Sequence, residues 1–329
     1  MRLLVTGGAG FIGSHYVRTL LSGGYPELPD AEVTVLDMLS YAGDRANLAP
    51  VAGDPRLRLV VGDVADAPLV DTLLPGVDAV VHFAAESHVD RAIARATPFT
   101  TTNVLGTQVL LDAATRHRVA RFVQVSTDEV YGSVSAGAAT EERALAPSNP
   151  YAASKAAADL MALAYHHTHG LPAIVTRGPN TYGPYQFPEK VVPLFVTNLL
   201  SGRPLPLYGD GAHTRSWLHV DDHCRGVQRA LTDGAPGEVY HVGGGTPLSN
   251  RELTGRLLAA FGVGWEVVRQ VPDRKGHDRR YCLDGTKLAE LGYTPRVGFD
   301  AGLAETVAWY RDNPGWWKAA RERAPLPPS

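Results

Sequence analysis

Cysteine is scarce in this chain, with two among 329 residues. Cys224 and Cys282 lie far apart and lack the close spacing that is typical of metal-binding cysteines. We therefore expect ordinary, half-buried thiols and no metal site.

The chain also lacks a strong net charge and a long apolar run. Its formal net charge is -3, and its arginines are spread rather than clustered, which argues against a nucleic-acid ligand. No charged leader precedes a long apolar stretch, so we expect neither a signal peptide nor a spanning helix, no membrane binding, and a cytoplasmic location. The remaining composition, 44% hydrophobic and 20% charged, is typical of a globular enzyme with a sizeable core.

A glycine-rich turn follows the first apolar stretch. Residues 2–6 predict a short strand, and residues 7–15 lead from it into a helix. Gly7 permits a tight turn, Gly10 lets the backbone approach a pyrophosphate, and Gly13 lets helix and strand pack closely. Because a helix N-terminus also offers N–H donors and a favourable dipole, this turn predicts a dinucleotide site. Taken alone, such a turn is weak evidence.

A carboxylate ends the second predicted strand, residues 33–36. Asp37 stands about where a carboxylate would accept hydrogen bonds from the adenosine ribose hydroxyls. A carboxylate there would repel a 2′-phosphate, so Asp37 favours NAD over NADP. The alternative is a solvated acid at a strand end.

Two more strand ends extend the predicted cofactor site. Residues 57–64 contain Asp63, which could meet the adenine or simply close a turn. Residues 77–85 end in small residues against which a flat cofactor could lie. We expect His82, inside that apolar stretch, to be a packed core residue. The full predicted cofactor set is Gly7, Gly10, Phe11, Ile12, Gly13, Asp37, Asp63, Val64, Phe83, Ala84, Ala85, Ser87, Tyr151 and Lys155.

The stretch of residues 122–132 carries more chemistry than a structural strand needs. The apolar run before Ser126 predicts a buried strand. The hydroxyls of Ser126 and Thr127 and the carboxylates of Asp128 and Glu129 therefore gather at its carboxyl end. In open α/β sheets this end faces the ligand crevice.

A tyrosine and a lysine follow on one helix face. Tyr151 and Lys155 lie four residues apart in an alanine-rich segment, so the ammonium can sit beside the phenol. Because a nearby positive charge favours phenolate, we expect the pKa of Tyr151 to lie below its usual value of about 10.

The alternation of short strands with helical segments predicts an α/β fold, a doubly wound parallel sheet of the Rossmann type. A long helix is expected over residues 98–117, from which Asn103 could touch the cofactor region. After Arg177 the sequence becomes rich in turns and aromatic residues. We therefore place a Rossmann domain at residues 1–177, with returning segments from later in the chain, and a smaller, mixed α/β substrate domain mainly at residues 178–329.

These motifs resemble the extended short-chain dehydrogenase/reductase superfamily and, within it, the dTDP-glucose 4,6-dehydratases. The superfamily is indicated by Thr6 to Gly13, by Asp37 and by the Tyr151/Lys155 pair. The dehydratases are indicated by Ser126 to Gly132, S-T-D-E-V-Y-G, where an Asp-Glu pair follows a threonine. Supporting stretches are Ala84 to Arg91, Gly183 to Lys190, Leu207 to Gly211 and Arg274 to Tyr281.

The resemblance implies an NAD-dependent dehydration of dTDP-glucose and a role for each matching residue. Thr127 would bind the sugar 4-hydroxyl, Tyr151 would be its base, and Lys155 would hold Tyr151 and the nicotinamide ribose. Asp128 would be the general acid and Glu129 the general base. The implied substrate-binding set is Ser87, Thr127, Asn180, Glu189, Lys190, Leu207, Tyr208, Arg215, Asn250, Arg274 and His277. The resemblance also suggests a homodimer joined through residues 98–117 and 151–169.

One segment departs from the family pattern, and two other functions stay open. Gly178-Pro179 and Thr181 replace more usual residues, and Pro179 lacks a backbone donor, so this loop could sit differently. The closest alternative function is a UDP-sugar decarboxylase or epimerase, which has no need of an acid at Asp128. A cofactor-binding sensor without turnover is the other alternative.

Overall fold

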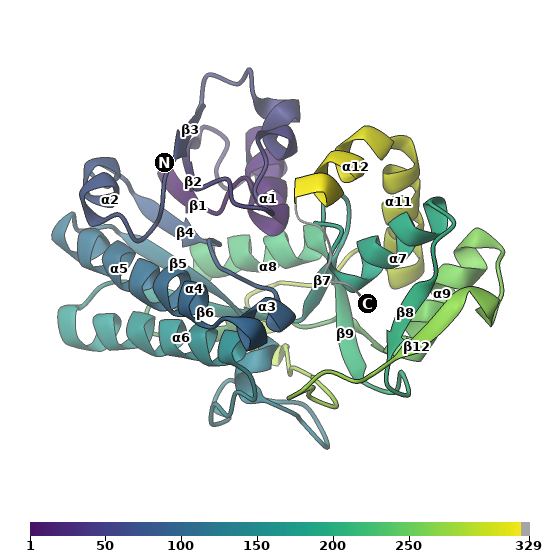
Figure 1. Ribbon diagram of the computed structural model, residues 1–329. Helices are drawn as coiled ribbons and strands as arrows, with labels where there is room; N and C mark the ends of the chain where they lie inside the picture. The colour runs from purple at the N-terminus through teal and green to yellow at the C-terminus, as the bar shows by residue number, and fades with distance from the viewer. Residues whose placement is uncertain (324–329) are drawn as a thin grey trace.

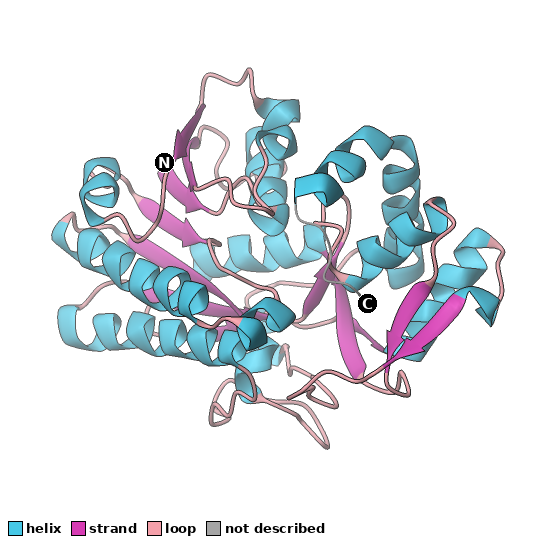
Figure 2. Cartoon of the chain, viewed as in Figure 1, coloured by secondary structure: helices cyan, strands magenta, loops and turns pink. Residues whose placement is uncertain are grey.

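A seven-stranded parallel sheet forms the centre of the larger lobe of this computed structural model, which describes residues 1–323 (Figures 1 and 2). Its strands in spatial order are β10 (Val239–His241), β6 (Ala173–Gly178), β5 (Arg121–Thr127), β4 (Ala79–His82), β1 (Arg2–Thr6), β2 (Glu32–Asp37) and β3 (Leu57–Val61). The order β3-β2-β1-β4-β5-β6 confirms the predicted doubly wound sheet, and β10 comes from much later in the chain.

Helices cover both faces of this sheet, because its strands are apolar on both sides. One face packs against α1 (Phe11–Leu21), η1 (Arg45–Val51) and α8 (Val220–Asp233). The other packs against α2 (Ala67–Leu73), α5 (Gly106–Arg116) and α6 (Pro150–His169). The sheet's carboxyl edge turns toward the second lobe, as Figure 1 shows.

The second lobe is built on two small sheets. One contains β11 (Thr246–Ser249), β9 (Thr214–His219) and β7 (Asn180–Tyr182); the other pairs β12 (Val268–Val271) with β8 (Leu205–Tyr208). Its helices are α7 (Val191–Leu200), α9 (Asn250–Phe261), η4 (Trp265–Val267), α11 (Phe299–Asp312) and α12 (Pro314–Arg323). They share one apolar core with β7 and β9. Trp309 lies here, whereas Tyr240 of β10 belongs to the large sheet.

The remaining short elements pack against the larger lobe. They are α3 (Val89–Ala94), α4 (Thr97–Phe99), η2 (Thr100–Leu105), η3 (Asp128–Tyr131) and α10 (Thr286–Glu290). Among the described residues, no helix combines the length and apolar character needed to cross a membrane.

Three predicted elements have different bounds. The third strand ends at Val61, because the chain turns where Asp63 accepts a hydrogen bond from the Ala65 N–H at 2.9 Å. The fourth strand covers only residues 79–82, since its neighbour β1 ends at Thr6. The predicted helix over residues 98–117 is divided into α4, the π-helical η2 and α5.

Candidate active site

The glycine turn joins β1 to α1 at the carboxyl edge of the large sheet. Gly7 has a φ of +66°, and a Cβ there would lie 2.6 Å from the Ala84 backbone nitrogen. A Cβ on Gly13 would lie 2.3 Å from the Gly7 carbonyl oxygen. Both positions therefore require glycine. Since no described side chain caps α1, its first N–H groups stay available to an anion.

Asp37 is held in a fixed orientation at the end of β2. Its two carboxylate oxygens accept hydrogen bonds from the Ala9 and Leu39 N–H groups, both at 2.9 Å. Burial raises the pKa of this carboxyl, while the backbone donors act in the opposite direction. The carboxylate is 7% exposed and faces a cavity rather than open solvent, so the alternative of a solvated strand-end acid is wrong.

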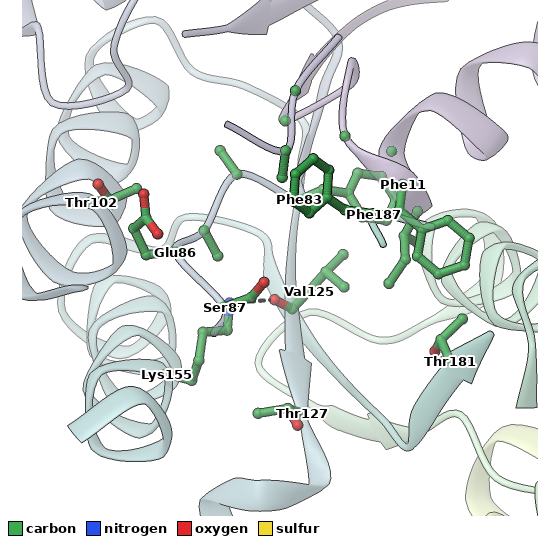
Figure 3. A pocket seen from close by; sticks show the side chains of 18 of the residues that line it. Phe11, Phe83, Glu86, Ser87, Thr102, Val125, Thr127, Lys155, Thr181 and Phe187 are labelled. Atoms are coloured by element: carbon green, nitrogen blue, oxygen red, sulfur yellow. Dashed lines mark hydrogen bonds between the residues drawn. The ribbon is translucent and has the colours of Figure 1, made fainter. Parts of the chain in front are cut away.

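The first cavity has a volume of about 300 Å³ and runs along this edge (Figure 3). Every residue of the predicted cofactor set lines it. These features match the parts of a dinucleotide. A pyrophosphate can lie beside Gly7 and the uncapped N–H donors of α1, and a ribose can lie beside the buried Asp37. The residues present therefore fit NAD.

Two predictions near this cavity have different outcomes. His82 is a buried core residue, as expected: its ring nitrogens bond the hydroxyls of Thr6 and Thr107, and burial lowers its pKa to about 3. Asn103 does not line the first cavity; instead its amide bonds the backbone of Glu86 and the hydroxyl of Ser154. It fixes the position of cavity-lining Glu86, and its neighbour Thr102 faces the cavity.

The carboxyl pair lies where β5 passes into η3. Asp128 is 2% exposed, and its Oδ1 accepts a hydrogen bond from the Thr127 hydroxyl at 3.2 Å. Its other oxygen is buried without a described partner. Burial and the neighbouring Glu129 carboxylate raise the pKa of Asp128 to about 8. Asp128 is therefore largely protonated at neutral pH, as an acid must be.

Glu129 has a different electrostatic environment. Burial raises its pKa, but the cations of Arg215, Lys190 and Arg274 lower it. Asp128 has a single cation, Arg215, acting on it in this way. Burial thus raises the pKa of both carboxyls, but three cations oppose that rise at Glu129 and one opposes it at Asp128.

The expected lowering of the Tyr151 pKa is wrong for this structure. Burial raises that pKa well above its usual value, and the carboxylates of Glu129 and Asp128 raise it further. The Lys155 ammonium instead donates a hydrogen bond to the Val125 carbonyl at 2.7 Å, the bond drawn in Figure 3. The helix spacing predicted that Tyr151 and Lys155 share one face, but not that the Val125 carbonyl on β5 would accept the lysine's hydrogen bond.

A second cavity, of about 120 Å³, adjoins the first. Glu129 and Asn180 line both, so the carboxyl pair stands at their junction. Five other predicted substrate residues line the second cavity, namely Tyr208, Arg215, Asn250, Arg274 and His277. Ser87, Thr127, Glu189 and Lys190 line the first. Leu207 lines neither, because its side chain is buried under Gly211.

The cations of the second cavity are not equivalent. Arg274 is tied to Asp90 by two hydrogen bonds, of 2.6 and 2.8 Å. Arg215 instead donates to carbonyl oxygens, of which that of Asp278 lies at 2.8 Å. Since carbonyls leave the guanidinium charge unneutralised, Arg215 is the better partner for a bound anion.

Sequence reasoning missed several residues of the second cavity. Asn149, Asp278 and Tyr281 line it, and the Tyr281 hydroxyl donates to the Asp278 carboxylate at 2.8 Å. Both residues lie inside the stretch from Arg274 to Tyr281 that supported the resemblance, so that motif contained the signal. Asn149 could have been found as the N-cap of α6, where it accepts from the Ala152 N–H.

One group in the described chain has metal-like composition: His213, Asp273 and His277, whose nearest ligand atoms lie within 4.8 Å of one another. The two imidazoles stack at 3.7 Å with their planes 14° apart. Lone pairs lie in the ring planes, so here they run side by side rather than toward a common point. Both rings also bond the same Asp273 carboxylate.

Comparison with known proteins places this site in a family. The family model described as GDP-mannose 4,6 dehydratase matches residues 4–306. The chain is 62% identical to a dTDP-glucose 4,6-dehydratase of Streptomyces antibioticus, over 98% of this chain and 96% of the relative. It is 59% identical to that of Streptomyces niveus, over 97% and 95%.

A solved structure agrees with these relatives. DesIV, a dTDP-glucose 4,6-dehydratase of Streptomyces venezuelae crystallised with NAD, has a TM-score of 0.96 and 64% identity, over 97% of this chain and all of that one. The chain therefore belongs to the GDP-mannose 4,6 dehydratase family of nucleotide-sugar enzymes. Within that family its relatives are the dTDP-glucose 4,6-dehydratases, which confirms the resemblance drawn from the sequence.

Proposed function

We propose that this protein is an NAD-dependent dTDP-glucose 4,6-dehydratase, which removes water from dTDP-glucose to give dTDP-4-keto-6-deoxyglucose. The relatives named above carry this activity in their names, and DesIV was crystallised with NAD. The observation that carries the proposal lies at the junction of the two cavities. There Asp128, whose pKa is about 8, adjoins Glu129, a carboxyl beside three cations. An epimerase or decarboxylase has no use for such an acid.

The first part of the reaction takes place around Tyr151. Bound NAD would supply an acceptor that removes a hydride from sugar carbon 4 and later returns it to carbon 6. Tyr151 takes the proton of the 4-hydroxyl, Thr127 orients that hydroxyl, and Lys155 holds the tyrosine and the nicotinamide ribose. The other members of the predicted cofactor set hold the dinucleotide along the first cavity.

Elimination then uses the two carboxyls. The 4-keto group acidifies the hydrogen on carbon 5, which Glu129 removes as a general base. Asp128 donates its proton to the 6-hydroxyl, which leaves as water. Burial favours the proton on Asp128, as its step requires, and the three cations beside Glu129 favour the charge that a base needs, against the burial that raises its pKa.

The second cavity would hold the nucleotide diphosphate. Arg215 supplies a guanidinium whose hydrogen bonds go to carbonyl oxygens, with Arg274, Asn250 and His277 beside it. Tyr208 would face the base, with Leu207 beneath it, and Ser87, Asn180, Glu189 and Lys190 would contact the sugar or phosphates. Residues 1–177 would thus serve mainly the cofactor, and residues 178–329 mainly the nucleotide sugar. We take the thymidine preference from the relatives' names.

We also propose a cytoplasmic homodimer joined through α5, η2 and α6, which lie side by side in Figure 1. Leu105 on η2 and Leu160 on α6 are large apolar side chains that are 45% and 57% exposed. A second copy that covered them would remove this apolar surface from water. Sedimentation of the wild type and of Leu160→Glu tests this proposal, with a monomeric variant expected.

The function is tested by incubating the pure protein with NAD and with dTDP-glucose or UDP-glucose in separate reactions. We expect a product lighter by one water from dTDP-glucose, faster than from UDP-glucose, and no accumulation of NADH. Equal efficiency with UDP-glucose would contradict the thymidine preference. Stoichiometric NADH release would indicate an ordinary dehydrogenase, a product of unchanged mass an epimerase, and binding without turnover a sensor.

A further inference from the structure

A buried carboxylate lies behind the active-site lysine. Lys155 and Asp159 are one turn apart on α6 and are 4% and 0% exposed. Asp159 accepts a hydrogen bond from the Arg177 Nε at 2.9 Å, and Arg177 is 2% exposed. The carboxylate is thus hydrogen-bonded to a buried guanidinium and lies one helical turn from a buried ammonium. Asp159 lines neither cavity, so the dehydration chemistry makes no direct use of it.

The polar groups beyond Arg177 are Tyr131, His241 and the Glu141 carboxylate, which accepts a hydrogen bond from the His241 backbone N–H at 3.0 Å. Arg177 donates to the Tyr131 hydroxyl at 2.5 Å, and the hydroxyl lies 2.6 Å from the His241 Nε2. The His241 Nδ1 lies 2.9 Å from the Asp284 carbonyl, an acceptor, so Nδ1 carries the proton and Tyr131 donates to Nε2. Burial lowers the pKa of His241 to about 4, which leaves that ring neutral.

The other titratable groups around Lys155 are also neutral or positive. His82 on β4 is neutral, because burial lowers its pKa to about 3. Tyr151, one turn earlier on α6, is protonated at rest because burial raises its pKa. Arg177 on β6 is a second cation. Asp159 is the carboxyl whose charge acts on Lys155. Burial raises the pKa of Asp159, and the Arg177 and Lys155 cations oppose that rise.

We propose that Asp159 is a positioning residue of the dehydratase, whose buried charge keeps the Lys155 ammonium protonated beside Tyr151. This role rests on the proposed function. Burial lowers the pKa of Lys155 to about 8, and Asp159 raises it against that effect. Without Asp159, burial would lower the pKa of the ammonium unopposed. An uncharged amine could no longer stabilise the phenolate that takes the sugar proton.

The test follows oxidation at carbon 4 in a background that carries Asp128→Asn, so that the titration of Asp128 does not overlap with that of Lys155. NAD-loaded enzyme is mixed with dTDP-glucose, and the absorbance of reduced nicotinamide is followed against pH. The alkaline limb of this pH profile is where cofactor reduction falls as Lys155 loses its proton. In Asp159→Asn we expect this limb to move to lower pH by about 1 to 3 pH units. The dTDP-glucose concentration for half-saturation should stay within about twofold, because Asp159 does not touch the substrate.

Arg177→Gln separates charge from packing. A purely structural role predicts that losing either partner has the same effect. The electrostatic role predicts shifts of different size: Asp159→Asn removes the charge outright, whereas Arg177→Gln only removes a cation that favours ionised Asp159, so its limb should move to lower pH by a smaller amount. This variant keeps the proposal testable even if Asp159→Asn does not fold.

A matched control is Asp222→Asn on α8. Like Asp159, Asp222 is 0% exposed, pairs with an arginine (Arg225, at 3.1 Å) and lines neither cavity. Unlike Asp159, it does not act on the charge of Lys155. It should lose thermal stability while its alkaline limb stays in place. An unmoved limb in Asp159→Asn, or a shift in Arg177→Gln that is equally large or goes to higher pH, would overturn the proposal. Absence of cofactor reduction in the background enzyme would instead contradict the dehydratase function itself.

Discussion

The two cavities are built in different ways. The first is shaped largely by backbone: glycines that a Cβ would fill, small residues after β4, and N–H groups at the start of α1. The second is formed by charged and aromatic side chains from segments far apart in the sequence, among them Tyr208, Arg215 and Arg274. Backbone geometry suits a cofactor part that many enzymes share, whereas side chains suit a specific substrate.

The largest effect is expected on kcat, from a substitution of Tyr151 that should leave both binding sites intact. Tyr151→Phe removes the proposed base, so kcat should fall on the order of 10²- to 10⁴-fold. Affinities for NAD and dTDP, measured by equilibrium titration, should stay close to wild type. Tyr165→Phe is the control on the same helix, because Tyr165 bonds Asp112 outside both cavities. A full loss of dTDP affinity in Tyr151→Phe would mean that Tyr151 also binds the nucleotide, and would contradict the division between the two cavities.

The backbone character of the first cavity is tested by Gly13→Ala. The added Cβ would meet the Gly7 carbonyl oxygen at 2.3 Å, which must displace the glycine turn. A clash costing about 2–3 kcal/mol would weaken NAD binding roughly 30- to 140-fold. Gly255→Ala on α9 is the control, since its Cβ would make an ordinary contact of 3.7 Å. Unchanged NAD affinity in Gly13→Ala would contradict the claim that backbone geometry shapes the first cavity.

The side-chain character of the second cavity is tested by Arg215→Gln. Loss of one charged contact worth about 1.5 kcal/mol should weaken dTDP binding roughly tenfold and leave NAD binding unchanged. Arg279→Gln provides the control, because the Arg279 side chain is 56% exposed and pairs with Asp210. Equal losses in the two variants would mean that a general positive field, rather than Arg215, holds the nucleotide.

The smallest effect is on stability. The pKa of Asp128 is about 8 in the folded protein and 3.8 as a free side chain, so folding favours its protonated form. This contribution is complete below pH 4 and is lost as the pH rises toward 8. Asp128→Asn cannot ionise, so its Tm relative to wild type should rise by a few degrees over that window. A Tm difference that is the same at pH 4 and pH 8 would contradict the burial of this acid.

The first cavity was largely predictable because its signals are local. A glycine turn, an acid at a strand end and a Tyr/Lys pair each span a few residues, and sheet topology brings them together. The second cavity depends on contacts between distant segments, and its residues were obtained from the resemblance rather than from spacing. Electrostatics was the least predictable part: the sequence did not indicate that Lys155 binds the Val125 carbonyl, nor that burial raises the pKa of Tyr151.

The central claim, that Asp128 is the acid and Glu129 the base, is tested most directly with a substrate whose carbon 6 hydroxyl is replaced by fluoride. Fluoride depends less than hydroxide on protonation in order to leave. Turnover by Asp128→Asn should therefore be substantially rescued, whereas Glu129→Gln should stay inactive because carbon 5 keeps its proton. Rescue of Glu129→Gln without rescue of Asp128→Asn would show that the two roles are reversed.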